Sequence, residues 1–424
     1  MKKEIDYEIL DSHVFVTKLA GFEHSEYIQE NETTEKINDD DIPLVQGKNI
    51  RNGRFVEKYD YYIKKEISDK LTRSKLTKDC ILIPYVGSNL GEVGIFYHKY
   101  DCQLASNIAK IELRDNTFDL EFLKYYLQSP LGQAFLFQSK QGSAQPNITM
   151  EAIRRTNVAK YDYTYQLKIA KVLKLIDDKI NINNRINDNL QQLILSIYNQ
   201  WFYKFNYPNS CKTNNNNPIN INENFCKTLP DGWKIETLAN NSLCSFINVG
   251  VDRFITKNYL ATANVNGYEI TDGDNINYEN RESRANMQPS LNSVWLAKMK
   301  NSIKHIFISK DAKWMVDKYI FSTGFTGFQC TDESFPYIAS LIMQDYIEIT
   351  KDTLAHGATQ ESVNNDDLDL IPVIIPSNEV LQKYSKIAGP YFIKMNQIMR
   401  ENQQLSKLRN ELLPLLMNGQ VSLI

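Results

Sequence analysis

The sequence predicts an α+β protein: two tandem α+β domains, separated and followed by long helices that pair as an antiparallel coiled coil with pseudo-two-fold symmetry. Three observations predict this organisation. One peptide occurs twice, an apolar helical pattern follows each copy, and strand and helix signals are mixed before each copy. At 424 residues, the chain can form two or three domains of ordinary size, each with its own core.

The duplicated peptide reads GSAQPNITMEAI from Gly142 and GATQESVNNDDL from Gly357. The offset is 357 − 142 = 215 residues, and it holds without gaps as far as Ile197 and Leu412. A match of this length is not chance, so the chain is a tandem duplication whose period is far longer than that of solenoid repeats. Pairs related by the offset include Gln145 with Gln360, Val158 with Val373, Arg185 with Arg400 and Leu193 with Leu408.

Each copy of the peptide follows about 130 to 150 residues of mixed character. In the first half, an apolar run bounded by turn residues predicts a strand at 79–86, and Gly87–Gly91 predicts the turn that follows it. Residues 92–97 predict a second strand, and Leu120–Tyr126 predicts a helix. Further strand candidates are Ile111, Val158 and the segment Leu370–Ile375.

Each half ends in a helix with a narrow apolar stripe, the pattern of a coiled-coil seam. The helices either pair with each other or pack separately on their own domains, and pairing is favoured because duplicated stripes are complementary by symmetry. Pro390 starts or kinks the second helix, Gly419 closes it, and Asn187 and Asn402 occupy matching positions that could fix the register. The stripe residues are Ile169, Val172, Ile176, Ile180, Ile186, Leu190, Leu193 and Ile197 in the first helix, and Ile398, Leu405, Leu408, Leu412 and Leu415 in the second.

These signals divide the chain into five segments. The stretch NYPNSCKTNNNNPININENF has the Asn, Pro and Ser content of a flexible linker, and LPDGW opens the second half. We expect a first domain at 1–160, a central helix at 161–205, the Asn-rich linker at 206–228, a second domain at 229–376 and a C-terminal helix at 377–424.

Composition and charge are those of a globular protein of the cytoplasm. Apolar residues make up 42% and charged residues 23%, and we find neither a signal peptide nor a long apolar run, so no membrane contact is expected. The six cysteines lie far apart, which predicts reduced thiols and argues against a zinc site. The net charge of −3 argues against a protein that coats nucleic acid indiscriminately.

Two windows of the sequence are nonetheless basic. Residues 46–78 hold ten Lys/Arg against four acids, a balance of +6, and residues 298–318 hold six Lys against two Asp, a balance of +4. A charge run is usually a solvated face, but one basic window in each half favours a surface that binds an anionic partner.

Motifs of catalysis are missing from the sequence. We find no glycine-rich cofactor loop or Asn/Asp-Pro-Pro-aromatic loop for base methylation, no GxxxxGK[ST] for ATP and no HExxH for zinc. Pro230-Asp231 followed by Glu236 lacks the Glu-x-Lys arrangement of nuclease acidic pairs. The sequence therefore assigns no catalytic residue and no metal ligand to this chain.

The order and duplication of these features resemble the specificity (S) subunit of type I restriction–modification systems, over nearly the whole chain. That family has two target-recognition domains in tandem, each followed by a long helix. One departure is that the second half has no counterpart of the glycine-rich turn Gly87–Gly94, so its recognition surface is expected to differ in detail. The segments that carry the resemblance are IPLVQGKNIRNGRF, DCILIPYVGSNLGEVGIF, LASNIAKIEL, FLKYYLQSPLGQ and GSAQPNIT in the first half, and LPDGW, ENRESRANMQPSLNSVWLAKMK, GATQ and LRNELLPLLMNG in the second.

The resemblance implies a non-catalytic subunit that recognises a bipartite, asymmetric target in double-stranded DNA. It also implies docking to two modification (methyltransferase) subunits and to restriction (translocase/nuclease) subunits. S-adenosylmethionine, ATP and Mg²⁺ are then expected on these partners, with no cofactor bound by this chain. The alternative within the class is a specificity subunit of a related methyltransferase-only or fused restriction system. A stand-alone nuclease and a purely structural scaffold are alternatives of other classes.

Candidate DNA contacts lie in both halves. Cationic side chains suit phosphate contacts, and Asn side chains can form bidentate contacts with adenine, although each candidate could instead be a solvated or turn-forming polar residue. Gly142, Gln145, Gly357 and Gln360 are expected to shape the joint between each domain and its helix. The predicted DNA-binding residues are Lys48, Asn49, Arg51, Asn52, Arg54, Tyr85, Ser88, Asn89, Ser106 and Asn107 in the first domain, and Arg281, Arg284, Asn286, Lys298 and Lys300 in a comparable role in the second.

The length of the helices predicts how far apart the two domains lie. A helix of about 35–40 residues spans roughly 50–60 Å, which corresponds to about one and a half turns of duplex DNA. Because the two domains differ in sequence, we expect two different short half-sites around a spacer that is not read. Each misread base pair should then cost about 1–3 kcal/mol of binding free energy.

Overall fold

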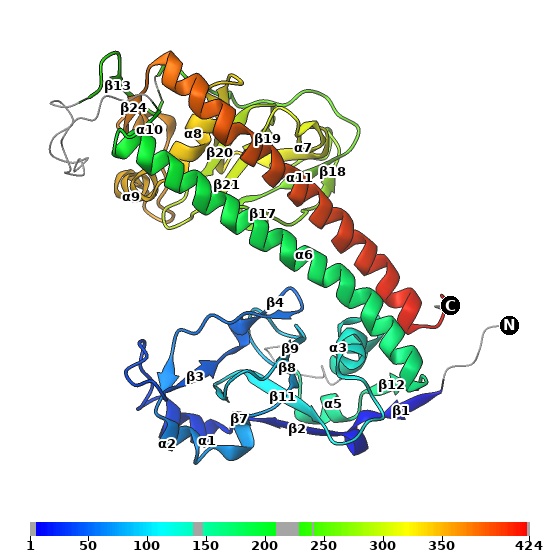
Figure 1. Ribbon diagram of the computed structural model, residues 1–424. Helices are drawn as coiled ribbons and strands as arrows, with labels where there is room; N and C mark the ends of the chain where they lie inside the picture. Colours follow the sequence, from blue (N-terminus) through cyan, green and yellow to red (C-terminus); the bar gives the residue numbers. More distant parts are fainter. Residues whose placement is uncertain (1–5, 139–146, 209–228, 240, 422–424) are drawn as a thin grey trace. The chain divides into compact units, whose positions relative to one another are not determined.

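The computed structural model describes residues 6–138, 147–208, 229–239 and 241–421 (Figure 1). The chain forms two compact units: unit 1 contains Met1–Ile180 and Leu405–Ile424, and unit 2 contains Asn181–Gln404. The long helices α6 (Tyr163–Tyr198) and α11 (Asn378–Met417) therefore each contribute one part to each unit. Apart from 206–208, the expected Asn-rich linker lies outside the described residues, as do Gly142 and Gln145.

Unit 1 contains two four-stranded sheets and two short strand pairs, and the strands predicted at 79–86 and 92–97 are confirmed as β8 and β9. One sheet has the order β2 (Val14–Lys18), β11 (Ile108–Leu113), β8 (Cys80–Pro84), β9 (Gly94–Phe96), and the other has the order β6 (Tyr62–Ile63), β3 (Ile42–Val45), β10 (Cys102–Leu104), β7 (Lys75–Leu76). The pairs are β1 (Tyr7–Ile9) with β12 (Asn157–Ala159), and β4 (Ile50–Arg51) with β5 (Arg54–Phe55).

Unit 2 repeats this topology strand for strand. One sheet has the order β14 (Cys244–Phe246), β23 (Phe325–Cys330), β20 (Ser293–Ala297), β21 (His305–Ile308), and the other has the order β18 (Asn275–Ile276), β15 (Lys257–Leu260), β22 (Tyr319–Ser322), β19 (Ala285–Met287). The pairs are β13 (Lys234–Thr237) with β24 (Pro372–Ile375), and β16 (Val265–Asn266) with β17 (Glu269–Ile270).

The strand correspondence is one to one, since each strand of unit 2 carries the number of its unit 1 counterpart plus twelve. Even the parallel pairing recurs: β10 runs parallel to β3, and β22 runs parallel to β15. The predicted tandem duplication is therefore confirmed, and it extends to the N-terminal part of each domain, where the sequences of the two halves have diverged.

Short helices cover the sheets and follow local capping signals. The Asp119 side chain accepts from the Phe122 N–H at 2.9 Å and starts α3, and Ser129 caps α4 with Pro130 at its first position. No helix in the described ranges is both long enough and apolar enough to cross a membrane. These helices are α1 (Gly21–Glu23), α2 (Lys65–Ser68), α3 (Leu120–Gln128), α4 (Pro130–Leu136) and α5 (Met150–Arg154) in unit 1, and α7 (Lys313–Lys318), α8 (Phe335–Ile342), α9 (Asp345–Leu354) and α10 (Asn365–Leu368) in unit 2.

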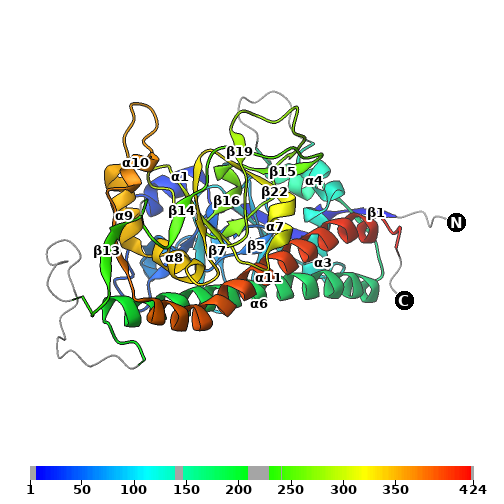
Figure 2. The same cartoon turned by 90° about the horizontal axis from the view of Figure 1, so that it is seen from above.

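The parts of α6 and α11 that belong to one unit lie side by side and run antiparallel (Figure 1, Figure 2). In unit 1, Arg409 Nη1 lies 2.9 Å from Asp177 Oδ1, and the Tyr161 hydroxyl donates to the Met417 carbonyl at 3.1 Å. The contact partner of Tyr161 is thus Met417, and that of Asp177, farther along the chain, is the earlier residue Arg409, as expected for antiparallel segments. The helix α11 begins at Asn378, so Pro390 lies inside it and does not start it.

In unit 2 the antiparallel pairing is fixed by asparagines. Asn183, whose side chain is buried, donates to Asn402 Oδ1 at 2.8 Å, and Asn402 Nδ2 donates to Asn184 Oδ1 at 2.7 Å. The predicted role of Asn402 in the register is consistent with these bonds, but its partners are Asn183 and Asn184. The matching position Asn187 holds a buried Oδ1 without a partner among the described residues.

The predicted apolar stripes are only partly the inward faces of the helices. Ile169, Ile176, Ile180 and Ile398 are buried as predicted, whereas Ile186, Leu193 and Leu408 are 36%, 42% and 45% exposed. Helix α6 carries an exposed apolar stripe, which includes Ile186 and Leu193, beside the stripe that contacts the domain cores, and in α11 the exposed Leu408 does not belong to the buried face. The residues that are buried in place of the exposed ones are Ile194, Tyr198, Leu413, Leu416 and Met417.

Candidate nucleic-acid interface

The hairpin β4–β5 in unit 1 presents the first group of predicted residues. Asn52 and Gly53 both have positive φ angles, 52° and 73°, as a tight two-residue hairpin turn requires. Glycine is favoured at position 53 by the positive φ, and a Cβ there would lie 2.5 Å from Gln128 Nε2, so the Gln128 amide would have to move. The turn is held on both sides: the Gly53 N–H donates to Glu92 Oε2 at 2.7 Å, and Gln128 Nε2 donates to the Gly53 carbonyl at 3.1 Å. The hairpin tip is therefore rigid.

The loop between β8 and β9, residues 85–93, packs against this hairpin. Asn89 Nδ2 donates to the Ile50 carbonyl at 2.9 Å and to the Gly47 carbonyl at 3.3 Å. Gln133, on α4, donates from Nε2 to the Gly91 carbonyl at 3.0 Å. Asn89 thus joins the loop to the hairpin, while Ser88 beside it is exposed.

A third segment completes the surface at Ser106 and Asn107. The Tyr85 N–H donates to the Asn107 carbonyl at 3.1 Å, and Asn107 is exposed with a φ of 69°. Tyr85 also carries the Lys18 ammonium over its ring, 4.3 Å from the centroid. We call the three segments 47–55, 85–93 and 106–107 together the first-domain surface. The fold brings all ten predicted residues of the first half to it.

Only some of those ten side chains are available to a ligand. Asn49 is 2% exposed, its Oδ1 accepts from the Gln46 N–H, and its Nδ2 donates to the carbonyls of Val56 and Lys58 at 3.0 and 2.8 Å. A base contact by Asn49 is therefore contradicted, because every one of its polar groups holds the loop together.

Arg54 is also directed into the fold. Its Nη2 donates to the Asp177 carbonyl at 3.1 Å, and its side chain is only 20% exposed. Arg51 differs from it, since it is exposed and donates from Nε to the Lys48 carbonyl at 3.1 Å. Lys48 forms an ion pair with Asp60 in which both side chains are well exposed, 39% and 45%. A pair of this kind contributes little stability and can be exchanged for a phosphate contact.

Unit 2 builds the same surface with different side chains. Asn264 Oδ1 accepts from the Ala261 N–H at 3.0 Å, as Asn49 Oδ1 accepts from the Gln46 N–H at 2.8 Å, and the offset is again 215 residues. The Lys298 N–H donates to the Gly324 carbonyl at 2.9 Å, which repeats the bond from Tyr85 to Asn107. We call the segments 262–270, 298–304 and 323–324 together the second-domain surface.

The predicted residues of the second half do not all lie there. Lys298 and Lys300 belong to the loop 298–304, which is the positional counterpart of the glycine-rich turn but contains no glycine. Arg281 and Arg284 lie between β18 and β19, and Asn286 lies in β19. The counterpart of Lys48–Arg54 is 263–269, which contains no Lys or Arg, so Arg281, Arg284 and Asn286 lie elsewhere in the fold and their comparable role stays a prediction.

Arg284 nevertheless borders the second-domain surface, because its carbonyl accepts from the Thr323 N–H at 2.9 Å. The Arg281 guanidinium stacks over the Tyr278 ring at 4.0 Å, and Arg253 lies over the same ring at 5.7 Å. The sequence-based prediction missed Arg253 and Tyr278. Arg253 and Tyr278 are close in space but twenty-five residues apart in the sequence, and such a separation gives no pattern that would identify them.

A buried charged cluster supports the loop 298–304 from below. His305 Nε2 lies 2.7 Å from Glu348 Oε1, and Glu348 Oε2 forms an ion pair with Lys351; these side chains are only 2%, 8% and 0% exposed. Lys351 Nζ donates to the Ser302 carbonyl at 3.2 Å. Burial alone would raise the pKa of Glu348, but the hydrogen bond from His305 and the charges of His305 and Lys351 hold that pKa below its ordinary value.

The position of Glu348 in unit 2 corresponds to that of Gln133 in unit 1, since 133 + 215 = 348. Both residues lie on the second helix after corresponding strands, α4 after β11 and α9 after β23. Gln133 donates directly to the loop of unit 1, whereas Glu348 pairs with Lys351, which donates to the loop of unit 2. The sequence-based prediction missed both residues. An i, i+3 Glu–Lys pair usually indicates an exposed helix face, and burial is not visible in the sequence.

Unit 1 has a second buried polar joint, at Asp177 on α6. The Asp177 carboxylate accepts from the Tyr125 hydroxyl at 2.7 Å and from Arg409 Nη1 at 2.9 Å, and Lys124 Nζ lies 3.5 Å away. Burial opposes ionisation, but the charges of Lys124 and Arg409 together hold the pKa of Asp177 below its usual range. The joint fastens α3, α6 and α11 to one another and also holds Arg54.

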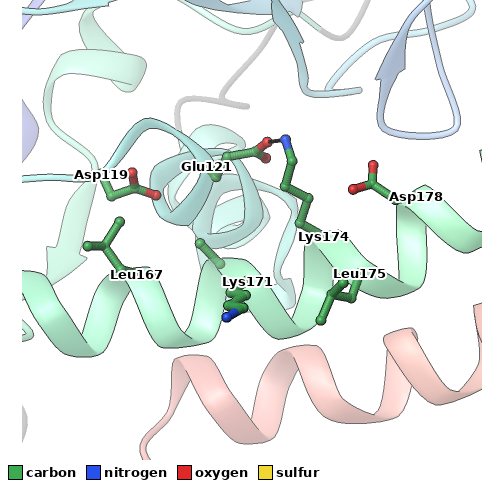
Figure 3. A pocket seen from close by; sticks show the side chains of 8 residues that line it. Asp119, Glu121, Leu167, Lys171, Lys174, Leu175 and Asp178 are labelled. Carbon is green, nitrogen blue, oxygen red and sulfur yellow. Dashed lines mark hydrogen bonds and ion pairs between the residues drawn. The ribbon is translucent and has the colours of Figure 1, made fainter.

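A pocket of about 240 Å³ lies beside this joint, between α6 and the start of α3 (Figure 3). Leu167, Lys171 and Leu175 line it from α6, and Glu121 reaches across to an ion pair with Lys174. Leu175 is 60% exposed, and the exposed Ile182, Ile186 and Leu193 follow it at intervals of seven, four and seven residues. Helix α6 thus presents an apolar stripe to solvent.

Comparisons with known proteins match the chain to one family. Residues 21–192 match the family described as the type I restriction modification DNA specificity domain. The type I restriction enzyme MjaIX specificity subunit of Methanocaldococcus jannaschii is 22% identical over 321 residues, which cover 71% of this chain and 69% of that protein. The type I restriction enzyme EcoBI specificity subunit of Escherichia coli is 27% identical over 164 residues, which cover 37% of this chain and 34% of that protein.

A solved structure supports the fold over the full length. The S subunit of a type I restriction–modification system from M. genitalium superposes with a TM-score of 0.51 at 16% identity, covering 97% of this chain and 96% of that one. The matched specificity domain lies on unit 1 and its helix, and the strand-for-strand repeat places a second domain of the same topology in unit 2. Residues 21–192 thus match the type I DNA specificity domain, and the chain is similar to the specificity (S) subunits of type I restriction–modification systems.

Proposed function

We propose that this chain reads DNA sequence for a type I restriction–modification complex and that each unit reads one half of a bipartite, asymmetric target. The observation that carries the proposal is the recurrence of one backbone surface in both units with different side chains on it. The same backbone arrangement then carries different base-contacting side chains in the two units, as recognition of two unlike half-sites requires. The recognition domains in this proposal are 1–160 and 229–376.

The available side chains divide by their chemistry. Arg51, Lys48 and Lys300 are cations at the edge of each surface and suit phosphate contacts, which set position without reading sequence. Asn52, Ser88 and Asn107 are exposed amides and a hydroxyl on rigid turns, and groups of this kind can read base edges. Because the chain as a whole has a net charge of −3, we assign part of the cationic clamp around DNA to partner subunits.

The two long helices act in this proposal as a spacer. The 36 residues of α6 correspond to roughly 54 Å at 1.5 Å per residue. Their antiparallel pairing is fixed in unit 1 by Asp177 with Arg409 and in unit 2 by Asn183 with Asn402. A spacer formed by the paired helices α6 and α11 would keep the unread part of the DNA target at one length.

Partner subunits supply the chemistry in this proposal. We assign methyl transfer with S-adenosylmethionine to two modification subunits, and ATP- and Mg²⁺-dependent translocation and cleavage to restriction subunits, all in the cytoplasm. The exposed stripe Leu175, Ile182, Ile186 and Leu193 supports docking on α6, because apolar residues at heptad-like spacing suit a partner helix. The chain itself would catalyse no step.

The test is co-expression of this chain with a cognate modification subunit, followed by sequencing of methylated bases across the genome. We expect one two-part motif whose halves differ. The variant Arg51→Ala should lower methylation at that motif without changing it, whereas Asn52→Ala should relax one base position in one half. The purified chain with Mg²⁺ and no partner should leave DNA uncut. Cleavage by the chain alone would overturn the non-catalytic assignment.

A further inference from the structure

The second copy of the duplicated peptide forms an exposed turn. His356 and Ser362 pair across its base, with backbone hydrogen bonds of 3.2 and 3.0 Å, and residues 357–361 form the tip. Gly357 has a φ of 138°, and a Cβ at this position would lie 2.6 Å from the Gln360 carbonyl oxygen. The glycine is therefore required by the close approach of the two sides of the turn.

The turn lies against the second-domain surface. The Val363 N–H donates to the Lys298 carbonyl at 3.0 Å, and the Lys300 N–H donates to the Glu361 carbonyl at 3.1 Å. Lys300 Nζ also lies 2.8 Å from Glu361 Oε2, with both side chains partly exposed. The turn thus lies against the loop 298–304, which carries candidate DNA contacts, and α10 and β24 separate it from α11, which begins at Asn378. The expected role of Gly357 and Gln360 at the joint between domain and helix is therefore wrong.

Packing does not explain the side chains of the turn. Ala358, Thr359 and Gln360 are all exposed, and the only polar contact of the Gln360 amide in the described part of the chain is a 3.5 Å approach to the Met299 sulfur. The backbone N–H groups of residues 357–361 also have no acceptor within the described ranges. The turn therefore presents a side-chain amide and several unpaired backbone donors to solvent.

The Gly-small-small-Gln sequence of the turn is nevertheless the same at 142–145 and 357–360, while the reading segments have diverged to RNGR at 51–54 and NGYE at 266–269. Two domains that read different half-sites share one feature of their ligand, the sugar–phosphate backbone. Unpaired backbone N–H groups and amide side chains are typical donors to phosphate oxygens. The Gly-small-small-Gln pattern, which both domains share, is therefore suited to the sugar–phosphate backbone, which both half-sites share.

We propose that the turn 357–361 binds the sugar–phosphate backbone of the half-site read by unit 2, with the Gln360 amide and the turn's backbone N–H groups as donors. The inference rests on the proposed function and assigns to this turn the sequence-independent part of binding. Glu361 holds Lys300 beside the turn until a phosphate replaces it, because an exposed ion pair is weak enough to exchange.

The experiment uses the full-length chain in complex with its modification subunit. Dissociation constants are measured for a duplex carrying the methylated motif and for a duplex of equal length without it. The variants are Gln360→Ala and Gly357→Ala, with Gln382→Ala as matched control, because Gln382 is an exposed glutamine of α11 outside the second-domain surface. Intrinsic tryptophan fluorescence during urea unfolding verifies that each variant is folded, since all four tryptophans lie in unit 2.

Gln360→Ala should weaken binding to both duplexes by about three- to tenfold, as expected for the loss of one hydrogen bond, and leave the methylated motif unchanged. Gly357→Ala should weaken it at least as much, because the added Cβ forces the turn open. Binding within twofold of Gln382→Ala for both variants would overturn the inference. A changed methylation motif would also overturn the inference, because Gln360 would then read a base. Loss of the modification subunit from the complex with unaltered DNA binding would overturn it too, because the turn would then contact a protein. If the unsubstituted complex does not distinguish the two duplexes, the proposed function fails, whatever the variants do.

Discussion

Removing the buried ammonium of Lys351 should destabilise unit 2 sharply. The Lys351 side chain is fully buried, pairs with Glu348 and donates to the Ser302 carbonyl at 3.2 Å. In Lys351→Met the Glu348 carboxylate stays buried with His305 as its remaining partner. Breaking a buried ion pair from one side costs about 3–5 kcal/mol of the free energy of unfolding, a large share of the 5–15 kcal/mol typical of a domain.

Removing both charges should cost much less. In Glu348→Gln with Lys351→Met, a neutral amide can still accept from His305, and replacement of a buried ion pair by neutral groups is often close to neutral in stability. We expect a loss of roughly 1 kcal/mol or less for the double variant, and hence a coupling energy of about 2 kcal/mol or more between the two positions. Lys300→Met is the matched control, because its pair with Glu361 is partly exposed and should contribute about 0–1 kcal/mol.

The assay is urea unfolding followed by tryptophan fluorescence, which reports unit 2 alone because Trp201, Trp233, Trp295 and Trp314 all belong to it. The same variants should show which function the cluster has. Because Lys351 holds the Ser302 carbonyl in the loop 298–304, Lys351→Met should relax base selectivity in the second half-site and leave the first half-site unchanged. A single-variant cost below about 1 kcal/mol, or equal costs for the single and double variants, would refute this reasoning.

Three further outcomes follow from unit 1 and the helices. Asp177→Ala should destabilise unit 1 by about 3 kcal/mol at neutral pH. Because the pKa of Asp177 is lowered in the folded state, its contribution to stability is lost as the pH falls through that folded pKa. The stability difference between variant and unsubstituted chain, measured by hydrogen exchange of α3, should therefore shrink below about pH 4, and a difference that stays constant with pH would contradict this prediction. Asn49→Ala should destabilise the first-domain surface by about 1–3 kcal/mol, since it removes the hydrogen bonds from the buried Asn49 amide to the carbonyls of Val56 and Lys58. Arg51→Ala should instead weaken DNA binding at unchanged stability, and the reverse assignment in paired unfolding and binding measurements would contradict the account. Four residues inserted within 176–200 add about 6 Å of helix, so the unread spacer found by methylome sequencing should lengthen, and an unchanged spacer would exclude the helices as its ruler.

The elements predicted correctly from the sequence are those with strong local signals. The strand at Cys80–Pro84 is a continuous buried apolar run, the helix at Leu120–Gln128 follows an Asp cap, and the two long helices have unbroken periodicity. Strands such as Ile50–Arg51 and Tyr62–Ile63 have two residues each, which is too short for any period to show. Their existence depends on partners distant in the sequence.

The inward faces of the long helices were predicted only partly, because some of the periodic apolar residues face solvent and not a core. Sequence spacing predicted one stripe per helix, but the cores of the two units decide which apolar residues are buried, so Ile186, Leu193 and Leu408 turned out to be exposed. The candidate site shows the same limit. Asn49 has a side chain that could contact a base, but it is buried and its amide donates to the carbonyl of Val56. Glu348 and Lys351 have the i, i+3 spacing of a surface ion pair, but their side chains are buried next to the loop 298–304.

The central claim is that the two units of one chain read different halves of one DNA target. Its most direct test is to exchange residues 229–376 for the second domain of another specificity subunit of known target and to sequence the methylated bases in cells that also express the modification subunit. We predict that the second half of the motif changes to that of the donor, while the first half and the spacer length stay the same. A motif that changes in both halves, or a single continuous motif before and after the exchange, would contradict the claim.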